Sequence, residues 1–127
     1  MLSTPTLHPF FSHFPPALFL AGLAMLALAR RRSDSRWVQA ACLNFSLGLL
    51  MAILAVLTGM FAADLSQWPI VEVEGHQGYS FAMVIFYIFC TVYVYTQPFK
   101  SAALFFYGLA VLSIGATAWS GYQLVFH

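Results

Sequence analysis

The chain has 127 residues, of which 61% are hydrophobic and only 7% are charged, and its formal net charge is +1. A soluble globular domain carries about 25% charged residues, so this composition excludes a soluble domain and indicates an integral membrane protein. Because one helical span needs about 20 apolar residues, the length suffices for about four spans and leaves no room for a separate soluble domain.

The charged residues divide the chain into four uncharged stretches, which we predict to be transmembrane helices. They cover residues 14–29, 38–61, 79–96 and 102–126. Pro15 and Pro16 suit the first turn of the first helix, where their missing N–H groups would have no partner. The arginines that follow this stretch favour a retained span over a cleaved signal. The short connections predict an all-α, up-down-up-down four-helix bundle that forms one domain over residues 1–127.

The basic residues predict how the bundle is oriented in the membrane. Four arginines lie between the first two spans and Lys100 lies between the last two, whereas the charged residues of the 62–78 connection are all acidic. Lys and Arg are enriched in cytoplasmic loops, so both basic connections are predicted to face the cytoplasm. Both termini and the 62–78 loop would then lie outside a bacterial cytoplasmic membrane.

Small residues at helical spacing predict how the spans pack, because close backbone approach holds helices together in lipid. These residues are Gly48, Ala52, Ala55 and Gly59 in the second span, and Ser113, Thr117 and Gly121 in the fourth. The third span carries bulky aromatic residues on all sides, so we expect much of its surface to face lipid or a partner protein. Cys42 and Cys90 are expected to be free thiols, since neither falls in an outer loop. No internal repeat is evident.

Several classes of function are disfavoured by what the spans lack. They contain no Asp, Glu, Lys or Arg, so a proton pump or an ion-coupled transporter of the usual carboxylate kind is not expected. The chain has no nucleotide-binding glycine loop, no nucleophile motif and no CxxC motif. No interaction with nucleic acid is expected. The remaining residues with distinctive chemistry are the histidines.

All four histidines are predicted to lie at the outer side of the membrane. His8 and His13 precede the first span, His76 precedes the third, and His127 ends the fourth. Counting about 1.5 Å per helical residue from the cytoplasmic flanks places His13 about 25 Å and His76 about 31 Å above them, a difference that helix tilt or a non-helical end can absorb. We therefore expect His13 and His76 to face each other, with His8 and His127 nearer the water.

Four stretches of the chain resemble a bacterial family of four-span membrane proteins known only as a domain of unknown function. "HPFFSHFPPALFLAGL" is similar to the family's opening HPxxxHFPIAL motif. "RWVQAACLNFSLGLLMAILAVLTGMFAADL" resembles its small-residue helix, in which Gly59 and Asp64 match a Gly-x-x-x-x-Asp exit. His76 matches a lone histidine, and "SGYQLVFH" resembles the closing GGxLVYxHG motif with Ser120 in place of the first glycine. Members occur beside cytochrome c and Rieske-type modules, which implies an electron-transfer setting.

Imidazoles gathered at one face allow three interpretations. Neutral imidazoles can ligate the iron of a b-type haem in a four-helix bundle, and this is the reading we favour. His8, His13, His76 and His127, with Asp64 or Glu74, would also form a ligand set for Zn or Cu. The third possibility is a structural role, in which the histidines bind loop carbonyls and helix ends.

The expected function is that of a membrane subunit in a redox assembly, more an electron-transfer or accessory subunit than a free-standing enzyme. Such a subunit would pass electrons between a quinol and a cytochrome c or Rieske-type protein at the outer side. The alternative is a non-catalytic accessory subunit that packs against other membrane subunits through its aromatic third span.

Overall fold

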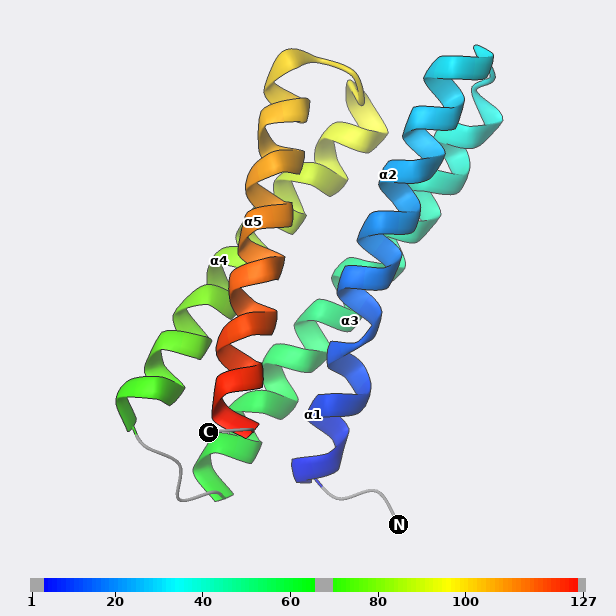
Figure 1. The fold of residues 1–127 in the computed structure, drawn as a ribbon. Helices are drawn as coiled ribbons and strands as arrows, with labels where there is room; N and C mark the ends of the chain where they lie inside the picture. Colours follow the sequence, from blue (N-terminus) through cyan, green and yellow to red (C-terminus); the bar gives the residue numbers. More distant parts are fainter. Residues whose placement is uncertain (1–3, 66–69, 126–127) are drawn as a thin grey trace.

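The computed structural model describes residues 4–65 and 70–125, and these residues form an all-α bundle (Figure 1). The helices are α1 (Thr4–Ser12), α2 (Phe14–Arg32), α3 (Arg36–Leu65), α4 (Ile70–Thr96) and α5 (Ser101–Val125). Within them, four segments are long and apolar enough to cross a membrane: Leu7–Arg32, Arg36–Phe61, Glu74–Thr96 and Ser101–Leu124. The predicted four-span membrane protein is thus confirmed.

The first span consists of two helices that meet at His13. Pro15 and Pro16 lie in the first turn of α2, as predicted. Neither can donate a hydrogen bond to the preceding turn, so the helix is interrupted there, although His13 itself keeps right-handed helical angles. The sequence analysis did not anticipate that α1 is helical. This short helix packs on α3 and thereby carries His8 into the bundle.

The connection between the second and third spans is much shorter than the predicted loop of residues 62–78. Helix α3 runs to Leu65 and α4 starts at Ile70. The polar residues here end the apolar segment without ending the helix, because backbone hydrogen bonds within a helix form equally well outside the hydrocarbon layer. Residues 66–69 lie outside the described part of the chain.

The spans form two hairpins, α2 with α3 and α4 with α5, and α3 packs against α4 to join them. The turn between α2 and α3 is tight: Ser33 adopts left-handed angles (φ 51°) at the end of α2. The Asp34 carboxylate then accepts a hydrogen bond of 3.0 Å from the backbone N–H of Arg36, which caps the start of α3. The start of α1 and the end of α5 lie at the same end of the bundle (Figure 1).

Aromatic rings fill the centre of the bundle. Phe19 stacks on Phe45 at 4.8 Å between ring centroids, and Phe19 also meets Tyr87 edge to face at 5.0 Å. The predicted small-residue face of α3 makes room for this cluster, since a side chain at Gly48 would collide with the hydroxyl of Tyr87. That hydroxyl donates a buried hydrogen bond of 3.1 Å to the carbonyl of Pro15.

The outer faces of the bundle are apolar, as expected for a protein in lipid. Helix α4 buries one stripe, Ser80, Met83, Tyr87, Cys90 and Val94, and exposes large side chains elsewhere, among them Phe81, Ile85 and Phe89. Cys42 and Cys90 are both free thiols, in agreement with the prediction.

Candidate functional site

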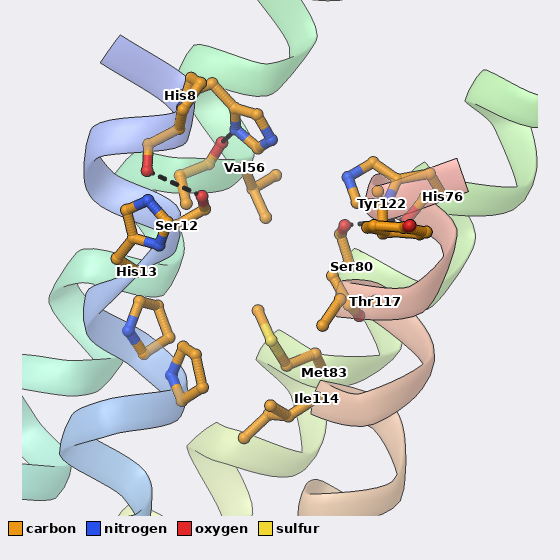
Figure 2. Close-up of a pocket in the computed structure, with 16 residues that line it drawn as sticks. His8, Ser12, His13, Val56, His76, Ser80, Met83, Ile114, Thr117 and Tyr122 are labelled. Carbon is orange, nitrogen blue, oxygen red and sulfur yellow. Dashed lines mark hydrogen bonds between the residues drawn. The ribbon is translucent and has the colours of Figure 1, made fainter. Parts of the chain in front are cut away.

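A cavity of about 370 Å³ lies at the end of the bundle where α1 begins and α5 ends, and all five helices contribute to its wall. Figure 2 shows His8, Ser12 and His13 on one side, with His76, Thr117 and Tyr122 on the other. Deeper in the cavity the wall is apolar and includes Met83 and Ile114. Its volume lies at the lower end of the ~300–1,000 Å³ that small-molecule sites occupy.

His8 is held from α3 by one ring nitrogen. Its Nδ1 lies 2.7 Å from the carbonyl oxygen of Ala55. A carbonyl only accepts hydrogen bonds, so Nδ1 carries the hydrogen and donates it. In the neutral ring the lone pair then lies on Nε2. Gly59 provides the space for this arrangement, because a Cβ there would lie 2.9 Å from both Cε1 and Nδ1 of His8.

His76 is held from α5 in a parallel manner. Its Nδ1 lies 2.8 Å from the hydroxyl oxygen of Ser120, and that hydroxyl donates its hydrogen to the carbonyl of Thr117 at 3.0 Å. The oxygen of Ser120 therefore accepts from Nδ1–H of His76, and the neutral ring again has its lone pair on Nε2. A glycine lies beside this histidine too, since a Cβ at Gly121 would come within 3.0 Å of Cε1.

The two imidazoles meet across the cavity. Their ring centroids are 6.0 Å apart and their planes stand at 82°, and Figure 2 shows both rings turned toward the space between the hairpins. Histidines that bind metals typically donate their second ring N–H to a carbonyl or another oxygen, which fixes the tautomer and the ring orientation. His8 and His76 both have such a contact through Nδ1, and in the neutral ring of each the lone pair lies on Nε2.

The structure changes the predicted partner of His76. His8, not His13, makes the ring contact with it, although His13 also lines the cavity and is exposed. The first span was predicted to begin at residue 14, but α1 continues the helical rise of α2 beyond the double proline. Helix α1 packs on α3 and brings His8 to the level of Ala55.

The other predicted ligands are not part of this pair. Glu74 is exposed and does not line the cavity. His127 and the side chain of Asp64 lie outside the described part of the structure. Among the side chains that are described, no three His, Cys, Asp or Glu residues gather closely enough to hold a metal ion. A tetrahedral zinc site, which has four ligands, is thus not built by the described side chains alone.

Sequence reasoning missed the groups that hold the histidines. The carbonyl of Ala55 leaves no trace in the sequence, because every residue has one. Ser120 was noted only as a departure from a glycine pair, and its hydroxyl proves to be the partner of His76. Gly59 and Gly121 were assigned to helix packing, and the structure shows that each also makes space for an imidazole.

The chain was compared with models of protein families. The model of the family described as "Predicted membrane protein (DUF2231)" matches residues 4–127. No curated protein and no solved structure matches the chain.

Proposed function

Given that the chain belongs to this DUF2231 family of predicted membrane proteins, we propose that it is a membrane subunit of an electron-transfer assembly. Its cavity would hold the redox centre through His8 and His76. The observation that carries the proposal is the pair of imidazoles, 6.0 Å apart, each tethered through Nδ1 to a neighbouring helix. A purely structural histidine needs one such hydrogen bond, but it has no need of a second imidazole 6.0 Å away across the same cavity.

A b-type haem is the first candidate for the centre. The donor set fits, because imidazoles are ligands of haem iron and the two histidines come from different helices on opposite sides of the cavity. The apolar wall suits a porphyrin. His8 and His76 would hold the iron, Ala55 and Ser120 would orient the imidazoles, and the buried aromatic cluster below would keep water out. The haem itself supplies one-electron transfer.

The size of the cavity favours a smaller centre as the second candidate. The cavity volume of about 370 Å³ lies near the lower end of the range for small-molecule sites, and a porphyrin is a large ligand for it. A bare ion needs no such space. Imidazole suits copper and zinc, and the thioether of Met83 in the same wall is a soft donor that suits Cu(I).

The setting of this function follows from the charges. The arginine-rich α2–α3 turn and Lys100 lie at the end of the bundle away from the cavity. The positive-inside rule places that end in the cytoplasm, which places the cavity at the outer face of a bacterial inner membrane with both termini outside. A cytochrome c or Rieske-type protein at that face would exchange electrons with the centre, and a quinol would supply them from the membrane. The exposed aromatic face of α4 would contact lipid and other membrane subunits.

An absorption spectrum tests this proposal. The full chain is purified in detergent from cells with ample haem, and reduced and oxidised spectra are recorded for the wild type, His8→Ala and His76→Ala. The expected result is a sharp Soret band that shifts on reduction and is lost in both variants. His13→Ala is the matched control, since it removes an imidazole from the same cavity, and it should keep the band. A folded wild type without visible absorption would overturn the haem assignment.

A further inference from the structure

The two hairpins of the bundle place equivalent residues at equivalent positions. In the first helix of each, buried residues follow the histidine at the same intervals. Phe19 follows His8 as Tyr87 follows His76. The buried pairs Pro15 and Met83, Gly22 and Cys90, and Leu26 and Val94 also correspond. The two lone histidines thus occupy the same place in two similar patterns.

The second helices of the hairpins correspond in the same way. Phe45 precedes Gly59 by the same interval as Tyr107 precedes Gly121, and both aromatic residues are buried. Gly59 makes space for His8, and Gly121 makes space for His76. Within each hairpin, therefore, a histidine of the first helix is seated against a glycine of the second.

Three pairs of equivalent residues contact each other across the bundle. His8 meets His76 at 6.0 Å between ring centroids, and Phe19 meets Tyr87 at 5.0 Å. Phe45 meets Tyr107 at 5.8 Å. A residue that lies on a twofold axis contacts its own counterpart, so these contacts trace one axis along the bundle. The arrangement departs from this symmetry in two respects. Helix α3 packs along α4, whereas α2 and α5 stay further apart (Figure 1), and the first span is interrupted at His13, whereas α4 is continuous.

We propose that the two hairpins are halves of an internal repeat related by a twofold axis, and that His8 and His76 are equivalent ligands of one transition-metal ion on that axis. With metal–nitrogen bonds of about 2.0 Å, imidazoles on opposite sides of one ion have ring centres roughly 6.4 Å apart. The observed separation of 6.0 Å is close to this value.

This inference deepens the proposed function by specifying the two ligands of the centre and the number of centres, which is one per chain. It rests on the same cavity but does not depend on haem, since the ion can be the iron of a haem or a bare ion. Each half contributes one imidazole, one oxygen that orients it and one glycine that seats it. His13 has no counterpart in the second hairpin, where Phe81 occupies the corresponding position, and is not a ligand.

The probe for the bare ion is Cu(I), which is titrated without oxygen into the detergent-purified full chain against a competing chelator. The expected result is one equivalent bound, with affinity lowered on the order of 100-fold or more, and by the same factor, in His8→Ala and His76→Ala. Ser120→Ala should lower the copper affinity about 10–100-fold, because the His76 ring then loses the hydroxyl that orients it. His13→Ala and Ser12→Ala are the controls from the same cavity wall, and both should bind as the wild type does.

A variant that does not fold would mimic the loss of a ligand. His8→Gly and His76→Gly are therefore also titrated with added imidazole, which should restore copper binding to each. Two ions per chain, a loss in His13→Ala as large as in His8→Ala, or normal binding in His76→Ala would each overturn the inference. A parallel titration with haemin distinguishes the source of the ion. If copper binding needs both histidines, this inference is supported. If the same chain takes up no haemin, haem is removed from the proposed function.

Discussion

Gly59→Ala tests whether the position of His8 depends on the glycine beside it. The new Cβ would lie 2.9 Å from two atoms of the imidazole, whereas carbon contacts are favourable at about 3.5–4.0 Å. The ring must then move by roughly half an ångström or more, which strains its hydrogen bond of 2.7 Å to Ala55. We expect the variant to fold and to hold His8 in the wrong place.

The magnitude follows from three contributions. Overpacking costs about 1–3 kcal/mol, and a weakened hydrogen bond costs up to about 1 kcal/mol. Replacing glycine by alanine within a helix returns about 1 kcal/mol. The net expectation is a loss of about 2 kcal/mol in the free energy of unfolding, together with weaker binding of the metal probe.

The assay is reversible unfolding of the full chain in detergent micelles, followed by circular dichroism, with a copper titration of each variant. Gly121→Ala should have a smaller effect, since its closest contact is 3.0 Å and involves one ring atom. Gly115→Ala is the control, because a Cβ there meets nothing within 4 Å, and it should be neutral or stabilising. If Gly59→Ala were as stable as Gly115→Ala and bound copper equally well, the conclusion that Gly59 makes space for the His8 ring would be refuted.

Three further predictions concern the rest of the bundle. Tyr87→Phe removes the hydrogen bond to Pro15 and should lower the free energy of unfolding by about 0.5–1.5 kcal/mol, measured in the same micelles. Ser33→Gly should raise it by up to about 1 kcal/mol, because glycine adopts the left-handed angles of this position without strain, and Ser33→Val should lower it. The pKa of Asp34 lies below its usual value, chiefly because the side chain of Arg36 donates hydrogen bonds to it. The ionised Asp34 carboxylate should therefore stabilise the fold above pH 3.8, and this stabilisation should be lost as the pH falls through the lowered pKa. This loss should be absent in Asp34→Asn, which a pH series of unfolding curves would show.

The four spans could be predicted because charge alone marks them. Lipid excludes charged side chains, so the uncharged stretches had to coincide with the membrane segments. Topology then places His8 and His76 at one end, since the chain crosses between them an even number of times. These features depend on composition and order, which the sequence states directly.

The arrangement of the site could not be predicted in the same way. The choice of His8 over His13 depends on α1 packing against α3, and the seat of His8 depends on the carbonyl of Ala55. Both are tertiary contacts that no spacing reveals. The correspondence proposed for the two hairpins could not be predicted from the sequence either, because it rests on a pattern of burial with little sequence identity, as in Phe19 and Tyr87.

The metal content of the purified chain tests the central claim most directly. Protein purified from membranes, never exposed to added metal, is analysed for iron, copper and zinc by mass spectrometry and for extractable haem. We predict about one metal centre per chain in the wild type and in His13→Ala, and almost none in His8→Ala and His76→Ala. A folded wild type without metal, or an unchanged metal content in His8→Ala, would contradict the account.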